Sequence, residues 1–520
     1  MELLALALSG MLGTLCPHLQ PHASPLPYLN SACNYYVSTN SKGYSGISGI
    51  VDELGPKLSG AANIYFPGSE GFDTATKRWS VRNAPNITVV VDVGTQGDVA
   101  ETVKYANAHE VPFLAYGTGH GAISSLGNMR EGILIWLRQL NSISVADDGQ
   151  TATFGGGVRV KQVMEALWEK GKKTVTGSCE CVGMMGPGLG GGHGVLQGRY
   201  GLIADQLVSL DMVLANGSSV TVNGHSDLWW AVKGAGHNFG IVTSFTSRIY
   251  DVHDDDQWAY QGFLFTHDKV EAVYTAINEY LLKDGIQPVD VISFSVFTNN
   301  PEADPDHSIV VFYILQEGVP AVEPRYVDPF MNINPFQTIS GNGPYTDTSK
   351  WLGGDNNSTY CQKAGLVNIL FPVDLQVYNV AAQRTAFDLF SHTTHANPAL
   401  NNSVYFFEGY PVQGVRAVAA ESTAFPHREA NILTAPFISY EPAGAERDDM
   451  ARAFGEQLRK IVFDGSGKIE MNAYVNYAFG EEGVESWYGF EPWRLERLRE
   501  LKKKYDPEGR LGFYAPVREN

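Results

Sequence analysis

Residues 176–194 read TGSCECVGMMGPGLGGGHG, and eight of these nineteen positions are glycine. Glycine permits positive φ angles and lets backbone N–H groups come close to a flat or phosphorylated ligand. Apolar residues such as Val182 and Leu189 are unusual in a freely mobile surface loop, which is the plainer interpretation. The stretch therefore favours a segment pressed against a dinucleotide.

Residues 186–191 inside this stretch formally match the GxGxxG fingerprint of dinucleotide-binding βαβ units. The match neither follows a clear strand nor opens a helix, since the glycines from 190 to 194 disfavour a helix start. A Rossmann fold is therefore not indicated.

A second glycine loop, residues 117–121, follows a strand, helix, strand pattern. The run ITVVVDV at 87–93 is rich in β-branched residues, and Thr95 and Asp98 form a capping box for a helix. The run VPFLAY at 111–116 then predicts a buried strand that leads directly into the loop.

His120 lies in this second loop, and Cys179 lies in the first. A single His is more often a hydrogen-bonded structural residue, and a single Cys is more often inert core. Their placement in two glycine loops favours chemistry instead. A metal site that recruits Cys181 and His193 as well is not predicted, because the Cys-x-Cys spacing lacks a matching second pair.

The cysteines, five in all, are too few and too scattered for a disulfide scaffold. We therefore expect any important cysteine to act chemically rather than architecturally. The net charge of −19 over 520 residues argues against nucleic acid as a partner. No interior run approaches the roughly 20 apolar residues that a membrane helix needs, so we expect a soluble protein without a membrane partner.

The remaining pattern divides the chain into two α+β units. Hairpin turns are predicted at 148–149 and 216–217, and an acidic run near residue 252 interrupts the first unit. Residues 253–465 mix strands with long helical stretches and predict a second α+β domain. The last segment, 466–520, is too short for its own core and is expected to return to the first domain.

Residues 1–24 begin with an apolar stretch that is similar to a signal peptide without a basic start. A clear cleavage site is missing, so a secretory location and a cytoplasmic one both stay open. Sequons that would permit glycosylation in the secreted case occur at Asn86, Asn216, Asn356, Asn357 and Asn401.

Several short motifs occur in a particular order along the chain. They are Gly119-His120, Gly177-Ser-Cys179 with Val182-Gly183, Leu189-Gly-Gly-Gly192, GAGHNFGIVTSF at 234–245, AYVNYAFG at 473–480 and KKKYDPEGRLGF at 502–513. Their order and spacing resemble the berberine-bridge-enzyme-like branch of the vanillyl-alcohol-oxidase family, of fungal type, over roughly residues 80–520.

The resemblance implies a PCMH-type FAD-binding domain made of two parts, residues 25–252 and 466–520. Between them it implies an inserted α+β substrate domain, residues 253–465, with an antiparallel sheet covered by helices. The resemblance also implies bicovalent FAD, attached to a His at the position of His120 and to a Cys at the position of Cys179.

Further contacts with FAD are implied for other residues of the same motifs. These are Gly117, Thr118, Gly119, Gly121, Val182, Gly183, Gly190, Gly191, Gly192, Asn238, Gly240, Ile241 and Asn476. Tyr116-Gly117-Thr118 stands where Arg-Ser-Gly is commoner in the family. Cys181 falls where the family usually has another residue, so we expect it to be a packing residue.

The resemblance assigns the chemistry to the segment Tyr-Val-Asn-Tyr. Tyr474 is the expected base, provided that a neighbouring group lowers the pKa of its phenol, and Asn476 is expected to support flavin or substrate. An ordinary strand on which Tyr474 and Tyr477 alternate is the plainer interpretation, and an acidic residue of the second domain is another candidate base. Val182 stands at the family's oxygen gate, and its small side chain implies access for O2.

The leading hypothesis is a monomeric FAD-linked oxidase that transfers a hydride from a small organic substrate, an intermediate of specialised metabolism, to flavin N5 and releases H2O2. A secreted carbohydrate oxidase that forms a lactone is the alternative, and a non-catalytic flavin-binding or ligand-binding protein is the hypothesis from another class. Aromatic residues of the second domain could line an apolar pocket or a sugar-stacking groove, or could be plain core. They are Tyr405, Phe406, Phe407, Tyr410, Phe437 and Tyr440.

Overall fold

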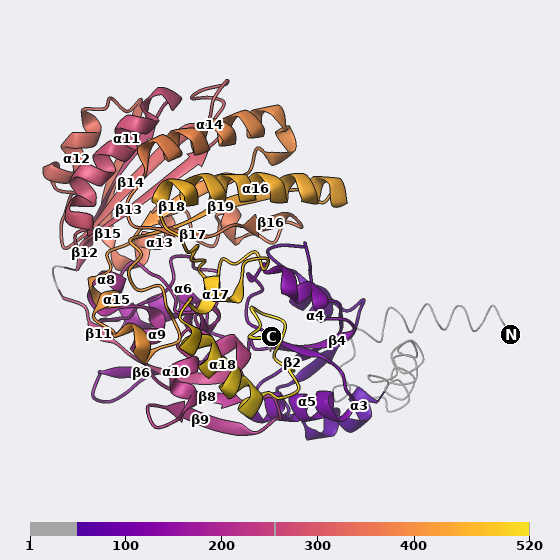
Figure 1. Ribbon diagram of the computed structural model, residues 1–520. Coiled ribbons are helices and arrows are strands. Elements are labelled where there is room, and N and C mark those ends of the chain that lie inside the picture. Colours follow the sequence, from indigo (N-terminus) through magenta and orange to yellow (C-terminus); the bar gives the residue numbers. More distant parts are fainter. Residues whose placement is uncertain (1–48, 254–255, 519–520) are drawn as a thin grey trace.

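Four β-sheets organise residues 49–253 and 256–518, which are the residues that the computed structural model describes (Figure 1). Sheets of four and five strands lie in the N-terminal half, and a sheet of eight strands is built from later residues. The fourth sheet pairs only β7 (Lys172–Lys173) with β11 (Tyr250–Asp251). In Figure 1 the large sheet and its helices form one lobe, and the four-stranded and five-stranded sheets lie in the other. The fold is α+β, as the sequence predicts.

The four-stranded sheet contains the predicted strand, helix, strand unit. Its order is β1 (Asn63–Tyr65), β2 (Ile87–Asp92), β4 (Gly132–Trp136) and β3 (Phe113–Tyr116). Helix α5 (Gln96–Ala108) begins at the predicted capping box, in which Thr95 and Asp98 each accept the backbone N–H of the other. The second glycine loop therefore starts at the carboxyl end of a buried strand.

The five-stranded sheet is antiparallel and contains both predicted hairpins. Its order is β5 (Ile143–Val145), β6 (Thr151–Gly155), β10 (Ile241–Arg248), β8 (Leu207–Val213) and β9 (Ser219–Asn223). The hairpin glycines, Gly149 and Gly217, have φ angles of 65° and 80°. Side chains disfavour such angles, which explains the choice of glycine at these turns.

The glycine-rich stretch at 176–194 runs between helix α6 (Val160–Trp168) and strand β8. A short helix, α7 (Met185–Leu189), covers most of the formal GxGxxG match. The expectation that no helix forms at this match is therefore wrong, but α7 has only five residues and does not follow directly from a strand, so the match does not form the strand, turn, helix unit of a Rossmann fold.

The eight-stranded sheet is antiparallel. Its main order is β15 (Gln337–Pro344), β12 (Gln257–Phe265), β14 (Ile309–Glu317), β13 (Val291–Thr298), β18 (Val404–Gly409), β19 (Ile432–Tyr440) and β16 (Val367–Leu370), and β17 (Val373–Leu375) also pairs with β19. Helices α11 (Val270–Ala276), α14 (Val380–Ala396) and α16 (Ala445–Ser466) share a hydrophobic core with this sheet (Figure 1).

Strand β18 presents alternate side chains to opposite faces of the sheet. Tyr405 and Phe407 are fully buried in the core beneath the helices. Phe406 packs instead against Tyr477 of the C-terminal segment, with ring centroids 5.7 Å apart. The sheet thus turns one face towards its helices and the other towards the second lobe.

The C-terminal segment, with helices α17 (Val484–Tyr488) and α18 (Pro492–Tyr505), packs against the N-terminal half. The Lys502 ammonium donates to the carbonyl oxygen of Asn238 at 2.9 Å, and the Val517 N–H donates to the Asn238 side chain at 2.9 Å. The buried Asn238 therefore forms hydrogen bonds with the C-terminal segment at two positions, Lys502 and Val517.

The described part of the chain includes no helix that is long and apolar enough to cross a bilayer. The expected signal peptide, residues 1–24, lies outside the described residues. The sequon residues Asn86, Asn216, Asn357 and Asn401 are exposed, as glycosylation requires, whereas Asn356 is half-buried.

Candidate active site

The two glycine loops lie against each other. The Thr118 hydroxyl accepts the backbone N–H of Gly183 at 3.1 Å and lies 3.2 Å from Nδ1 of His120. Gly119 has a φ angle of 78°, and a Cβ there would overlap the side chain of Tyr116. The fold thus brings together two loops that are far apart in the sequence, and residue 119 must be glycine because of its own positive φ angle and the nearby Tyr116 ring.

The surroundings of His120 keep its imidazole neutral. Burial, together with the positive charges of Lys363 and Arg78, lowers the pKa of His120 to about 4. Lys363 donates to the Tyr116 hydroxyl at 3.2 Å, and Arg78 donates to the carbonyl oxygen of Gly121 at 2.6 Å. An uncharged imidazole retains a nitrogen lone pair at neutral pH, which is the form that can act as a nucleophile.

Cys179 carries a free thiol on the other loop. The pKa of this thiol is raised to about 12, mainly because the surrounding protein excludes water and to a smaller extent because Glu408 is negatively charged. The neighbouring Ser178 hydroxyl lies 3.1 Å from the Tyr410 hydroxyl, at the end of strand β18. The thiol-bearing loop therefore contacts the large sheet directly.

Open space lies beside glycines of both loops. A Cβ built on Gly117 would meet no atom within 4 Å, and one built on Gly183 would lie 3.8 Å from the nearest atom. These positions are partly buried and share their loops with His120 and Cys179. Bare backbone next to a neutral imidazole and a thiol fits a flat ring system with a diphosphate, so the residues present fit FAD.

The triple glycine at 190–192 allows other side chains to pack directly against the backbone, where a Cβ atom would otherwise lie. An added Cβ would overlap a different side chain at each position: Asn476 at Gly190, Phe425 at Gly191 and Ile203 at Gly192. The glycines therefore let the stretch lie directly against the segment that contains Tyr474 and Asn476.

Three other residues with implied FAD contacts, Asn238, Gly240 and Ile241, pack inside the protein core. The Asn238 amide donates to the Tyr488 hydroxyl at 3.1 Å and to the Ala515 carbonyl oxygen at 3.2 Å. Ile241 is 2% exposed, and an added Cβ on Gly240 would lie 2.9 Å from a methionine methyl group. The side chains of Asn238 and Ile241 thus support the fold, and contact of these residues with FAD stays a prediction.

The prediction for Cys181 is wrong. Cys181 is not a packing residue but forms a disulfide with Cys361, 180 residues further along the chain. Its sulfur also lies 3.4 Å from Nε2 of His120. A cysteine therefore has an architectural role after all, because the disulfide ties the loop of Cys179 to the segment between β15 and β16. Spacing could not reveal this pair, since its partner lies in the inserted part of the chain.

The Tyr-Val-Asn-Tyr segment is a turn and not a strand, since the Tyr477 N–H donates to the Tyr474 carbonyl oxygen at 2.9 Å. The Tyr474 hydroxyl accepts from the Asn476 amide at 2.7 Å and from the His193 N–H at 3.4 Å. Burial outweighs these hydrogen bonds and raises the pKa of Tyr474 to about 12. The condition for a phenolate base is therefore not met, and Tyr474 is a neutral hydrogen-bonding phenol at neutral pH.

A buried carboxyl group, Glu408, lies beside this turn and was not among the predicted site residues. The Tyr477 hydroxyl donates to its Oε1 at 3.3 Å. Burial raises the pKa of Glu408 to about 7, although hydrogen bonds from Tyr410 and Tyr477 act in the opposite direction. The sequence does contain one indication of Glu408, because it is the single acidic residue in the largely apolar run SVYFFEGY.

His193, from the glycine-rich stretch, packs against two tyrosines of this site. Its ring centroid lies 4.7 Å from that of Tyr474 and 6.0 Å from that of Tyr410. Its Nδ1 lies 2.9 Å from the Gln197 side-chain oxygen, and burial lowers the pKa of His193 to about 4. The imidazole is therefore neutral, and Glu408 stands out in this cluster as a group that titrates near pH 7.

Val182 lies on the loop of Cys179 and is partly exposed. Its N–H donates to the Cys179 carbonyl oxygen at 3.3 Å, and its own carbonyl oxygen accepts the N–H of Val160 at 2.9 Å. The main chain thus fixes this small side chain close to the thiol.

Two family descriptions match the chain. Residues 87–223 match the FAD binding domain, and residues 473–516 match the berberine and berberine like family. The FAD-linked oxidoreductase chyH of Penicillium rubens is 49% identical over 465 residues, which cover 89% of this chain and 93% of that protein.

Solved structures share the fold. BBE-like 1 of Physcomitrella patens has a TM-score of 0.74 at 22% identity and covers 91% of this chain and 100% of its own. Xylooligosaccharide oxidase from Myceliophthora thermophila C1, in complex with xylobiose, has a TM-score of 0.75 at 19% identity and covers 91% of this chain and 99% of its own.

These matches agree with the geometry of the two glycine loops and the turn at Tyr474. They also disfavour the hypothesis of a non-catalytic flavin-binding protein, because the full-length relative is an oxidoreductase. The chain belongs to the berberine-bridge-enzyme-like family of FAD-linked oxidoreductases, and it is an FAD-dependent oxidoreductase.

Proposed function

We propose that the chain is an FAD-linked oxidase of a small organic molecule, in which Glu408 is the general base. The observation that carries the proposal is a buried carboxyl group with a pKa of about 7, hydrogen-bonded to the turn that holds Tyr474 and Asn476. Bound FAD would supply the acceptor for a hydride from the substrate carbon and the route for electrons to O2, with H2O2 as the product.

Glu408 removes the proton that must leave as the substrate is oxidised. A carbon that bears a hydroxyl group can give up a hydride only as the hydroxyl proton is lost. A base with a pKa near 7 is ionised in a large fraction of molecules near neutral pH and still has a high affinity for a proton. Both properties are needed for efficient proton removal. Its carboxylate oxygens accept hydrogen bonds from Tyr410 and Tyr477, which hold it in place.

Tyr474 orients the substrate oxygen. Its own oxygen already accepts N–H groups from Asn476 and His193, so the phenolic proton remains available for donation. A donated hydrogen bond of this kind would hold the substrate hydroxyl oxygen while its proton is directed towards Glu408. Tyr474 is therefore a hydrogen-bond donor and not the base.

His120 and Cys179 are the residues to which we assign covalent attachment of FAD. The neutral imidazole of His120 is in its nucleophilic form. The disulfide removes Cys181 from competition and leaves Cys179 as the free thiol in the described part of the chain. Val182, fixed close to Cys179, supports oxidase over dehydrogenase behaviour, because its small side chain leaves room for O2.

A secreted carbohydrate oxidase is the second candidate. The shared fold with xylooligosaccharide oxidase supports it, as do aromatic rings such as Phe406 and Tyr410 on the face of the sheet near Glu408. The disulfide supports a location in the secretory pathway for either candidate, since such bonds persist in oxidising compartments.

The test is H2O2 release by the purified protein with two substrate panels, one of small benzylic and phenolic alcohols and one of oligosaccharides. The proposal expects turnover in the first panel and a loss of about 10²-fold or more in Glu408→Gln. Turnover confined to oligosaccharides would favour the second candidate. Release of H2O2 at the wild-type rate by Glu408→Gln would sink the assignment of the base.

A further inference from the structure

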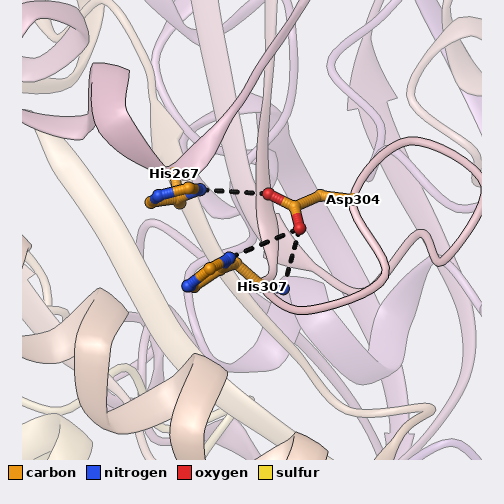
Figure 2. A group of neighbouring side chains, drawn as sticks. All are labelled: His267, Asp304 and His307. Atoms are coloured by element: carbon orange, nitrogen blue, oxygen red, sulfur yellow. Dashed lines mark hydrogen bonds and ion pairs between the residues drawn. The ribbon is translucent and has the colours of Figure 1, made fainter.

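Three potential metal ligands meet at the edge of the eight-stranded sheet. His267 begins the short turn after strand β12, and Asp304 and His307 belong to the loop between β13 and β14 (Figure 2). The nitrogen and oxygen atoms that they offer all lie within 4.8 Å of one another. None of the three takes part in the oxidase chemistry proposed above.

Asp304 contacts both imidazoles through different oxygens. Its Oδ2 lies 3.0 Å from Nδ1 of His267, and its Oδ1 lies 3.4 Å from Nδ1 of His307. The two rings stack with centroids 3.8 Å apart and an interplanar angle of 21°. Both Nδ1 atoms therefore face one carboxylate, as Figure 2 shows.

The main chain and neighbouring side chains hold this arrangement in place. Oδ1 of Asp304 accepts the backbone N–H groups of Asp306 at 3.1 Å and of His307 at 3.0 Å. Arg384 of helix α14 donates to the carbonyl oxygen of His267 at 2.6 Å. The Asp304 carboxylate and the main chain of His267 are thus positioned by contacts that do not depend on a bound ion.

The cluster opens into a cavity of about 680 Å³ that contains more imidazoles. His267 and His307 line it together with His392 and His395 of helix α14. Nδ1 of His395 lies 2.8 Å from the Ser391 carbonyl oxygen, so that nitrogen carries the proton and Nε2 is left with a free lone pair. Four imidazoles on one cavity make it rich in nitrogen ligands.

We propose that His267, Asp304 and His307 bind one divalent transition-metal ion of the Zn²⁺ class. Imidazole nitrogen with carboxylate oxygen is a ligand set that suits such ions, and Mg²⁺ or Ca²⁺ would require more oxygen ligands. Bond lengths of about 2.0–2.1 Å in a tetrahedral site place ligand atoms roughly 3.3–3.5 Å apart. The two nitrogen–oxygen separations of 3.0 and 3.4 Å lie close to this range, and the offered atoms as a group lie within 4.8 Å, so the side chains must draw together around the ion.

Solvent has direct access to the ligands. The side chains of His267 and His307 are 40% and 47% exposed, whereas that of Asp304 is 12% exposed. A metal ion can therefore enter without a rearrangement of the fold, and water or a group of the cavity would complete its coordination.

The site is distant from Glu408. In the register of the sheet, Glu408 pairs with Phe294 near the start of β13, and the loop of Asp304 follows Thr298 at the end of that strand. Four residues of strand at about 3.3 Å each separate them by roughly 13 Å along the strand direction. Metal binding is thus separable from the oxidase chemistry, and its failure would leave the proposed function intact.

The test is calorimetric titration of the flavin-loaded full-length protein with Zn²⁺, after treatment with a chelator and exchange into a buffer that does not bind metal. The double variant His267→Ala/His307→Ala is expected to bind one equivalent less than the wild type. The matched control is His225→Ala, an exposed His of the other lobe, which is expected to leave the stoichiometry unchanged.

Asp304→Asn provides a second variant that should keep the loop folded, because its side-chain oxygen can still accept the N–H groups of residues 306 and 307. We expect its affinity for Zn²⁺ to fall about 10-fold or more, since a neutral amide is a weaker ligand than a carboxylate. An equal Zn²⁺ stoichiometry in the wild type and the double variant, or an unchanged affinity in Asp304→Asn, would overturn the proposal.

Discussion

The Tyr477 hydroxyl donates to the carboxyl group of Glu408 at 3.3 Å and so joins a turn of the C-terminal segment to strand β18 of the large sheet. The same sheet reaches the loop of Cys179 through the contact between Ser178 and Tyr410. Three segments that are distant in the sequence therefore meet around one buried acid. This meeting point is the reason that we place the chemistry there.

Tyr474→Phe tests the role of the phenol. The Asn476 amide and the His193 N–H would each lose an acceptor, so we expect a loss of about 1–3 kcal/mol in stability, measured by denaturant unfolding. Turnover should fall about 10- to 100-fold, because a positioning hydrogen bond to the substrate is lost. The rise of activity with pH near 7 should persist, since Tyr474 has a pKa of about 12. If that rise vanished, Tyr474 would be the base.

Cys181→Ser/Cys361→Ser tests the architectural role of the disulfide. The bond closes a loop of 180 residues, and its removal should destabilise the protein by about 3–5 kcal/mol through the greater entropy of the unfolded chain. The double substitution avoids an unpaired thiol next to Cys179. Thermal unfolding with and without a reductant is the measurement. An unchanged Tm, together with insensitivity of the wild type to reductant, would contradict the role.

His120→Ala and Cys179→Ala test the two attachment points. After acid precipitation, the wild type should keep its yellow colour in the pellet, and each single variant should keep it through the remaining bond. The double variant should release its flavin into the supernatant. Absorption spectra of pellet and supernatant give the result, and colour that washes out of the wild-type pellet would refute both assignments.

The sequence predicts those parts of the fold that depend on neighbouring residues. The capping box of Thr95 and Asp98 is satisfied within four residues, and helix α5 begins where it was expected. The hairpins at Gly149 and Gly217 likewise follow from a local need for positive φ angles. Such features are decided by the chain within a few positions, so a pattern is enough to find them.

The candidate site could be predicted only in part, because long-range contacts decide the rest. His120 and Cys179 were found from their glycine loops and a family resemblance. The strand pattern of SVYFFEGY does not show that Glu408 meets Tyr477 across two lobes. The disulfide partner of Cys181 lies 180 residues away, and no local pattern signals it. The pKa of Tyr474 depends on burial by distant segments, so the sequence could state the condition for a Tyr474 base but not that the condition fails.

A second buried carboxyl group provides a matched control for Glu408. Burial raises the pKa of Asp374, on strand β17, to about 7 as well. Asp374 and Glu408 both pair with Leu433 of β19, from opposite sides. The two groups therefore titrate in the same range, but Asp374 lies two strands away from Glu408.

The most direct measurement is the pH dependence of flavin reduction in a single anaerobic turnover, for the wild type, Glu408→Gln and Asp374→Asn. Glu408 acts as a base only when ionised, so the wild-type rate should fall as the pH drops through about 7 and stay constant above it. Glu408→Gln should be slower by about 10²–10⁴-fold and lack this fall, and Asp374→Asn should retain it. A wild-type profile in Glu408→Gln, or loss of the fall in Asp374→Asn, would contradict the account.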